Sequence, residues 1–441
     1  MSKTHSSAYR WYVVGVLTLA YLISFLDRQI LALMVEPIKD DLNLTDTQIS
    51  LLMGFAFSLF YVTMAIPLGR LADRKSRRVI ITVGIVFWSL MTAACGLAAK
   101  FSHLFLARVG VGVGEASLSP SAISMIADYF PSAQRGRAIG TFHMGVSLGA
   151  GVAMVLGGFV VSYVATAAPL ELPVFGVLKS WQYVFLLVAL PGLFVAVLMM
   201  LTVKEPPRTE VLATASGGMS FVEALAYLWQ RRRVYVSLFL GMTVVTIVGY
   251  AYFSWVAAMF IRQYGWTIGE VGKTYGAMIM LVGPTGILTG GWLVDRIEQK
   301  GRHDAPVIVA LIGAIITLPA VLLMPMMPNG FWAMLMIASS SLGLSMGTAA
   351  GAVAVVMVTP NQMRGQTIAI YNLTLSVFGL IIGPTGVAIL TDFLFADEKM
   401  LHWSLGLVGA ISATFSIILL AAALKPYRAE RQALEQVSVS G

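Results

Sequence analysis

Four ionisable side chains stand inside long apolar stretches of this sequence: Asp27, Arg28, Arg108 and Glu115. A charge in the hydrocarbon core of a bilayer costs roughly 2.5–3.5 kcal/mol even on the gentler insertion scales, so such residues mark functional sites. A low-dielectric environment favours the protonated form of a carboxylic acid. Asp27 and Glu115 therefore have the chemistry to bind and release protons. Arg28 and Arg108 carry the planar donor fork that suits phosphate or carboxylate.

The depths of these four residues predict which of them meet. Asp27 and Arg28 lie roughly 6–7 Å outward from the centre of the first apolar run, and Arg108 lies roughly 10 Å outward from Glu115 in the fourth. Arg108 and Glu115 are seven residues apart, so they share one helix face. Asp27 is then at a depth where it can meet Arg108. In principle both arginines can serve Asp27, which leaves Glu115 as the unpaired acid. The alternative is a purely structural ion pair between Asp27 and Arg108.

The composition dictates what kind of element carries these residues. Only 11% of the 441 residues are charged, against about 25% in soluble domains. Hydrophobic residues make up 58% of the chain, and the mean hydropathy is +0.83. So few charges exclude a water-soluble enzyme, and so much apolar sequence excludes a disordered chain. The chain is therefore a polytopic membrane protein.

The apolar stretches predict an all-α protein with twelve membrane-spanning helices. A spanning helix needs roughly 20 mostly apolar residues, whereas a barrel strand is about ten residues of alternating polarity. Twelve runs meet the helix criterion, and we place them at about 11–35, 48–69, 79–99, 103–126, 138–165, 181–203, 234–260, 274–294, 306–324, 331–358, 367–390 and 403–424.

The basic residues predict the orientation and the domain boundaries. If both termini are cytoplasmic, 21 of the 29 Lys and Arg fall in cytoplasmic segments and six in outer loops. This bias follows the positive-inside rule, so we expect an inner-membrane protein with both ends in the cytoplasm. The longest cytoplasmic connection divides the spans six to six. We therefore expect an N-terminal bundle over 1–203, a linker over 204–233 and a C-terminal bundle over 234–441.

The two predicted halves repeat one another. The segments 69–74 and 291–296 follow spans two and eight and share Gly, Leu, Asp and Arg at matching positions. A Gly-Pro-Thr-Gly sequence occurs at 283–286 and again at 383–386, in the middle spans of two three-span units. Nested three-span repeats within six-span halves are typical of the major facilitator transporters.

The loop after span two resembles the loop motif of the major facilitator superfamily. Its residues are Asp73, Arg74, Lys75, Arg77 and Arg78 after Gly69, with Ser76 where that family usually has Gly. The resemblance implies two pseudo-symmetric six-helix bundles that work by alternating access. Within the superfamily, 26–28 and 108–117 resemble the spinster family of lipid transporters. In spinster-like proteins the matching Asp, Arg and Glu positions are functional.

The spinster resemblance implies that Asp27 and Glu115 couple transport to protons, and that Arg28 and Arg108 hold an anionic substrate group. It also implies that the substrate is an amphipathic lipid such as a lysolipid or sphingolipid. Organic-anion:proton symporters of the same superfamily also carry Asp-Arg in span one and Glu-Ala in span four. They are the first alternative, and a membrane sensor that binds such a ligand without moving it is the second.

The repeated loop charges predict a cytoplasmic gate made of Asp73, Arg74, Arg77, Asp295 and Arg296. In this interpretation they latch one conformation of the transporter. The alternative is that they only obey the positive-inside rule.

Spans seven and eleven supply aromatic and small polar groups, of which Tyr250, Tyr371 and Asn372 are candidates for lining a substrate cavity. A cavity that is charged on one wall and aromatic on the other suits an amphipathic anion. The alternative is packing or lipid contact.

Other chemistries have weak or no signals. Gly110, Gly112 and Gly114 superficially suggest a nucleotide loop, but they lie in a predicted span with no preceding strand, so we interpret them as helix-packing residues. No Gly-x-x-x-x-Gly-Lys-Ser/Thr motif is present, so we expect no ATP-driven activity. The histidines are scattered and Cys95 is the one cysteine. We therefore expect a monomeric protein that is not an enzyme, with no cofactor, metal site or nucleic-acid partner, whose partners are protons, membrane lipid and an amphipathic anionic small molecule or lipid.

Overall fold

The computed structural model describes residues 6–167, 171–172, 176–208, 221–360 and 362–440. The described chain is helical apart from one short hairpin, in which β1 (Glu171–Leu172) pairs antiparallel with β2 (Gly176–Val177). The all-α prediction is therefore confirmed. Part of the predicted linker, residues 209–220, lies outside the described residues.

The chain forms two compact units. Unit 1 comprises residues 1–211 and 256–280, and unit 2 comprises residues 212–255 and 281–441. Two long helices belong to both units, because α11 (Arg232–Tyr264) ends in unit 1 and α12 (Ile268–Glu298) begins there. The proposed boundaries at 203 and 233 stay a prediction.

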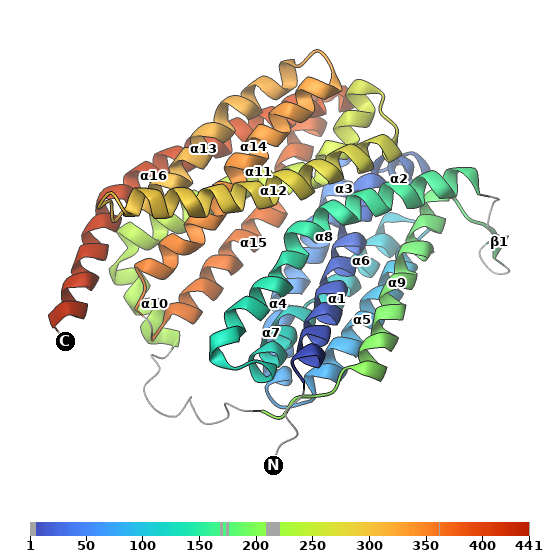
Figure 1. Cartoon of the computed structure of the whole chain (residues 1–441). Helices are drawn as coiled ribbons and strands as arrows, with labels where there is room; N and C mark the ends of the chain where they lie inside the picture. Colours follow the sequence, from blue (N-terminus) through green and yellow to red (C-terminus); the bar gives the residue numbers. More distant parts are fainter. Residues whose placement is uncertain (1–5, 168–170, 173–175, 209–220, 361, 441) are drawn as a thin grey trace. The chain divides into compact units, whose positions relative to one another are not determined.

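Unit 1 holds the deep charges, and its helices run side by side (Figure 1). The helices that complete unit 1, in chain order, are α1 (Ser7–Leu33), α2 (Val35–Leu42), α3 (Asp46–Met53), α4 (Phe55–Ala72), α5 (Arg77–Cys95), α6 (Phe101–Glu115), α7 (Leu118–Tyr129), α8 (Ser132–Thr166) and α9 (Ser180–Thr202). The remaining helices of unit 2 are α10 (Phe221–Gln230), α13 (Ala305–Leu323), α14 (Gly330–Met357), α15 (Arg364–Ile389) and α16 (Leu401–Ser440). The short helix η2 (Met324–Met326) connects α13 to α14, and η3 (Leu390–Phe395) and η4 (Glu398–Met400) connect α15 to α16.

Eleven helical segments in the described chain are long and apolar enough to cross a membrane. The remaining predicted span, about 103–126, corresponds to two consecutive helices. It breaks after Glu115, where α6 ends, and α7 begins at Leu118. The sequence analysis did not predict this break, although Pro120 lacks the backbone N–H that would bond to the Ala116 carbonyl in a continuous helix. As a result, one of the deep acids lies at a helix end.

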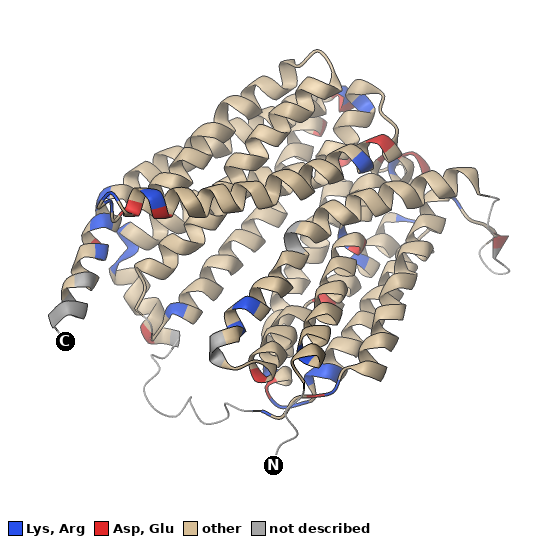
Figure 2. Ribbon diagram, in the orientation of Figure 1, with Lys and Arg blue, Asp and Glu red and all other residues tan. Residues whose placement is uncertain are grey.

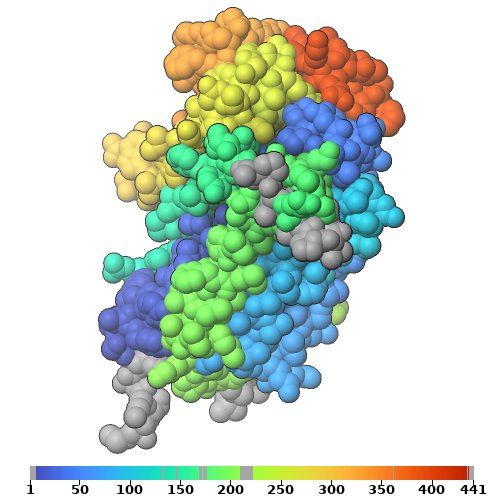
Figure 3. Space-filling model, turned by 90° about the vertical axis from the view of Figure 1, so that its right-hand side faces the viewer, coloured from blue at the N-terminus to red at the C-terminus, as the bar shows by residue number. Residues whose placement is uncertain are grey.

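Small residues set the packing around this broken span. A Cβ at Gly112 would lie 2.4 Å from the Phe57 carbonyl oxygen of α4, and one at Gly114 would lie 2.8 Å from the Trp88 Cβ of α5. A Cβ at Gly110 would meet Met91 of α5 at 2.5 Å. The interpretation of these glycines as helix-packing residues is confirmed. α5 in turn packs beside α9, as the adjoining blue and green surfaces of Figure 3 show.

Capping side chains fix where several helices begin. Thr45 and Gln48 form a capping box at the start of α3, and Ser76 accepts from the Val79 N–H at the start of α5. These side chains satisfy backbone donors that a helix start leaves unpaired. Charged residues gather mainly at the helix ends and in the loops, as Figure 2 shows. The deep charges of unit 1 are the exception.

Candidate functional site

Arg28 of α1 and Glu115 of α6 form a buried ion pair. Arg28 Nε lies 2.6 Å from Glu115 Oε2, and a terminal guanidinium nitrogen contacts the same oxygen. The Glu115 side chain is 0% exposed, whereas the Arg28 side chain keeps 19% exposure. Glu115 is the last residue of α6, so the pair joins α1 to the break in the fourth span.

Three aromatic rings surround the Arg28 guanidinium. Its central carbon lies 5.0 Å from the Phe25 ring centroid, 4.6 Å from Phe57 and 5.1 Å from Tyr61. Aromatic faces attract cations, and the attraction strengthens when the cation is removed from water. The rings therefore stabilise Arg28 as a cation beside a surface that is otherwise apolar.

Arg108 is held by backbone carbonyls. Its Nε donates to the Leu52 carbonyl at 3.3 Å, and a terminal nitrogen donates to the backbone carbonyl of Asp27 at 3.2 Å. Arg108 is 2% exposed. It therefore links α6 to the backbones of α1 and α3 and places a positive charge next to the Asp27 carboxylate.

The Asp27 carboxylate points toward α5. It is 0% exposed, and neither carboxylate oxygen has a hydrogen-bond partner of good geometry among the described residues. The polar side chains of Trp88 and Thr92 of α5 lie close to it. A fully buried acid without a strong partner is costly unless it exchanges a proton or meets a ligand.

These contacts correct the pairing that depth alone suggested. Depth allowed Asp27 to meet Arg108, or both arginines to serve Asp27 with Glu115 left unpaired. In the structure Glu115 pairs with Arg28, and the hydrogen bond from Arg108 to Asp27 goes to its backbone oxygen. Adjacent residues point about 100° apart around a helix, so Asp27 and Arg28 face different neighbours.

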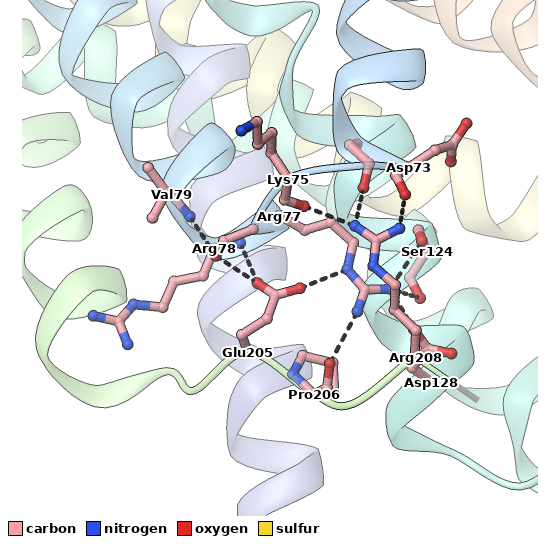
Figure 4. Close-up of polar contacts among 12 residues, drawn as sticks. Asp73, Lys75, Arg77, Arg78, Val79, Ser124, Asp128, Glu205, Pro206 and Arg208 are labelled. Atoms are coloured by element: carbon pink, nitrogen blue, oxygen red, sulfur yellow. Dashed lines mark hydrogen bonds and ion pairs between the residues drawn. The ribbon is translucent and has the colours of Figure 1, made fainter. Parts of the chain in front are cut away.

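At the opposite end of unit 1, Arg77 lies in a buried polar cluster (Figure 4). Arg77 is 1% exposed and forms ion pairs with Asp128 and with Glu205, the latter at 2.8 Å. It also donates to Ser124 of α7, at 3.0 Å to the hydroxyl, and to the Pro206 carbonyl at 3.1 Å. The predicted gate residue Arg77 therefore joins α5 and α7 to the segment that follows α9.

Glu205 caps the start of α5. Its carboxylate accepts from the Ser76 hydroxyl and from the Arg78 backbone N–H, each at 2.8 Å. A carboxylate at a helix N-terminus also interacts favourably with the helix dipole. Burial by itself would raise the pKa of Glu205, but the hydrogen bonds from Arg78, Arg77 and Ser76 outweigh burial and hold the pKa below its ordinary value.

Arg208 caps the end of α4, three residues after Glu205. It donates to the backbone carbonyls of Ala72 and Lys75, each at 2.8 Å, and to that of Asp73. The Asp73 carboxylate itself points away from the cluster (Figure 4). Arg74 is exposed. Of the gate residues predicted in this loop, only Arg77 has its side chain in the cluster.

Unit 2 has a buried polar cluster before α13, the helix that corresponds to α5 in the repeat. It is centred on an acid, whereas the cluster in unit 1 is centred on an arginine. Asp304, which precedes α13, is 0% exposed and accepts from Arg302 at 3.0 Å and from Arg428 of α16 at 2.6 Å. Burial would raise the pKa of Asp304, but these two arginines keep it below its ordinary value. The predicted gate residues Asp295 and Arg296 are exposed on α12 and lie outside this cluster. Asp304 and Arg428 were missed by the sequence argument.

A third cluster joins the end of α11 to α2 and α3. Arg262 contacts Asp46 at 2.6 Å and Glu36 at 2.8 Å, and Lys39 also pairs with Asp46. The Asp46 side chain is 0% exposed, that of Lys39 4% and that of Arg262 7%. Lys39 and Arg262 are two of the six basic residues that the orientation count placed in outer loops. That count did not predict that they are buried.

A sequence model of a known protein family matches most of this chain, including the loop after α4. The model, described as "Major Facilitator Superfamily", matches residues 17–384. The chain belongs to the major facilitator superfamily. This superfamily consists of membrane transporters, so the chain is a multi-pass transporter of small molecules rather than an enzyme.

Three similar superfamily members refine this assignment. A crystal structure of a bacterial homologue of the human lysosomal transporter Spinster, inward-facing and unoccupied, has a TM-score of 0.79 and 29% identity and covers 97% of this chain and 98% of its own. An "MFS-type efflux pump" of Mycolicibacterium smegmatis is 27% identical over 96% of this chain and 91% of its own length. A probable L-galactonate transporter of Escherichia coli is 26% identical over 73% of this chain and 70% of its own. The resemblance to the spinster family is thereby confirmed.

The cavity candidates of this transporter lie in unit 2 and differ in exposure. Tyr371 is 1% exposed and lies 5.3 Å from the Phe239 ring. Tyr250 packs against α15, where a Cβ at Gly379 would meet its ring at 2.5 Å. Asn372 is exposed. Their role in lining a cavity stays a prediction.

Proposed function

We propose that this chain is a proton-coupled secondary transporter of an amphipathic, lysolipid- or sphingolipid-like anion, working by alternating access in the inner membrane with both termini in the cytoplasm. The observation that carries the proposal is the buried Arg28–Glu115 pair beside the Asp27 carboxylate. Two acids and two arginines in one apolar bundle form a set in which proton binding changes the net charge.

Proton binding is coupled to substrate binding because Glu115 and the substrate anion compete for Arg28. With Glu115 ionised, Arg28 is paired and its charge is neutralised. When Glu115 takes up a proton, Arg28 loses its carboxylate partner and is available to an anionic group. Arg28 is the member of the set that keeps some exposure, so it is the residue that contacts substrate. Arg108 acts through its fixed positive charge, and Asp27 is the second proton-coupling acid.

The aromatic rings around Arg28 support an amphipathic substrate. Phe25 and Tyr61, which are partly exposed, offer apolar surface next to the cation, and the buried Phe57 packs behind it. An anion with a hydrocarbon tail gains binding free energy from both parts of this site. Its charge pairs with the arginine while its tail packs against the aromatic rings. The resemblance of 26–28 and 108–117 to the spinster family of lipid transporters supports the same substrate class.

A second candidate is a proton-linked carrier of small organic anions. The likeness to a probable L-galactonate transporter favours it. A sugar acid uses the arginine charge and has no tail for the aromatic rings. A sensor that binds the anion without moving it would show binding and no transfer across the bilayer.

The deciding experiment uses the purified protein in liposomes with and without a pH gradient. Movement of a fluorescent lysophospholipid is measured by albumin extraction, and uptake of radiolabelled hexuronate is measured in parallel vesicles. We expect lipid transfer that a pH gradient accelerates. Uptake of hexuronate alone would establish the second candidate, and no transfer of either compound despite binding would establish a sensor.

The loop charges Asp73, Arg74, Arg77, Asp295 and Arg296 are proposed as parts of the cytoplasmic gate. The polar cluster supports this role for Arg77, since this one cation ties α5 and α7 to the segment after α9. For the other four residues the repeated sequence pattern is the support.

A further inference from the structure

An apolar groove lies between α4 and α5 on unit 1. Its volume is about 620 Å³. The walls are Leu68 and Leu71 from α4 and Val79, Val83 and Phe87 from α5, and Val113 contributes to the floor. The groove exists because α4 and α5 each pack against α6 and scarcely touch one another.

The walls of this groove are exposed although they are apolar. Val83 is 61% exposed, Val79 43%, Leu71 42% and Phe87 40%. They belong to two helices that are long and apolar enough to cross a membrane. In a membrane protein such side chains face the hydrocarbon of the bilayer, so hydrocarbon is the chemistry that the groove accommodates.

A cation closes one end of the groove. Lys75 lines the groove with Ser76 and is exposed. The neighbouring guanidiniums of Arg77 and Arg208 are engaged by Glu205 and by backbone carbonyls. The Lys75 side chain extends away from those contacts (Figure 4) and has no ion-pair partner among the described residues. Its charge is therefore available to a ligand.

The length of the groove fits one leaflet. From Ser76 to Phe87 the chain rises eleven residues, roughly 16 Å along α5. Half of the hydrocarbon core of a bilayer is about 15 Å. A lipid whose phosphate lies at Lys75 therefore places its acyl chain along the whole groove.

We propose that this groove binds one acyl chain of an anionic bilayer phospholipid, whose phosphate pairs with Lys75. The site is separate from the Arg28–Glu115 site and does not depend on the proposed substrate. A bound lipid would pack against α4, α5 and the break between α6 and α7 at once, and so stabilise the part of unit 1 that carries Glu115.

The test is lipid retention by the purified full chain, measured by native mass spectrometry after exposure to equal amounts of phosphatidylglycerol and phosphatidylcholine. Val83→Trp fills the groove, and Val197→Trp on α9, where Val197 is 56% exposed outside the groove, is its matched control. Lys75→Ala removes the rim charge, and Lys300→Ala removes an exposed lysine elsewhere.

We expect the wild type and both controls to retain phosphatidylglycerol in preference to phosphatidylcholine. Val83→Trp should abolish retention, and Lys75→Ala should weaken it by roughly fivefold, as one interfacial cation contributes. Undiminished retention in Val83→Trp, or loss in Val197→Trp to the same degree, would overturn the proposal.

Discussion

Arg262, near the end of α11, binds Asp46 of α3 through two nitrogens, at 2.6 Å and 2.8 Å from the two carboxylate oxygens. Asp46 is also the partner of Lys39, so one carboxylate balances two nearly buried cations. Removing one partner of a buried ion pair costs about 3–5 kcal/mol, because a charge is left unpaired. Asp46 is therefore the residue on which this cluster depends.

We expect Asp46→Ala to lower the free energy of unfolding by about 3 kcal/mol or more. Glu36→Ala should cost about 1 kcal/mol, because Arg262 keeps Asp46 and the Glu36 side chain is 22% exposed. Asp40→Ala is the control, since Asp40 lies beside this cluster in the sequence and is exposed. Thermal unfolding in detergent measures the loss of stability in each variant. Equal losses in Asp46→Ala and Asp40→Ala would contradict the assignment.

The second prediction concerns the deep acids. Glu115→Gln and Asp27→Asn each keep the shape of the side chain and replace its titratable carboxyl group with an amide that does not titrate. We expect each to reduce pH-gradient-driven transport in liposomes at least tenfold while facilitated exchange without a gradient persists. Glu398→Gln, an exposed acid in η4, should behave as wild type. Full gradient-driven transport in both deep variants would exclude them as coupling residues.

The third prediction separates the shape of Arg28 from its charge. Arg28→Lys keeps a cation but loses the planar fork and much of the contact with the Phe57 ring, 4.6 Å from the guanidinium. We expect the affinity for substrate to fall about fivefold to tenfold. Arg108→Lys should have a smaller effect on affinity if Arg108 acts only through its charge. Binding is measured by fluorescence of a labelled lysolipid, and a larger loss in Arg108→Lys would assign the contact to Arg108 instead.

The fourth prediction tests the gate role of the loop charges. Asp73→Ala leaves the Arg77 cluster in place, because the Asp73 side chain points away from it. A gate residue acts on the interconversion of conformations, so we expect the rate of transport to fall by severalfold and substrate affinity to change little. Arg70→Ala, which removes an exposed basic residue at the end of α4 that is not assigned to the gate, provides the comparison. Weakened binding at an unchanged rate would count against a gate.

Much of the fold was predictable because hydropathy reports directly on membrane helices. The helical class, the burial of Asp27 and Glu115 and the duplicated plan all follow from long apolar runs and repeated loop residues. The partners of the deep charges were not predictable from depth. Whether Arg28 or Asp27 faces α6 depends on the rotation of α1. The break after Glu115 was also missed, and Pro120 was the signal that could have indicated it.

The polar clusters at the helix ends were missed for a different reason. Glu205 and Arg208 are ordinary loop residues by composition, and their role depends on a segment after α9 returning to the ends of α4 and α5. Asp304 and Arg428 occupy the corresponding place in unit 2 with the charges exchanged. Searching for identical residues finds the repeated Asp73 and Asp295 and overlooks a pair whose signs are reversed.

The last prediction uses the pKa of Glu205, which the hydrogen bonds at the start of α5 hold below its ordinary value. The unfolded chain has a glutamate pKa of about 4.3. A depressed pKa in the folded state stabilises the protein above that value, and the contribution disappears as the pH falls through the folded pKa.

We therefore expect Glu205→Gln to be less stable than wild type by about 1 kcal/mol at pH 7, since hydrogen bonds to a partly exposed carboxylate are lost or weakened. The difference should shrink as the pH falls below about 4.3. Glu171→Gln, which changes an exposed residue of β1, should match wild type in stability throughout. Thermal unfolding between pH 3 and pH 7 measures both differences. A Glu205→Gln difference that stays constant across this range would show that packing of the side chain, rather than its charge, stabilises the start of α5.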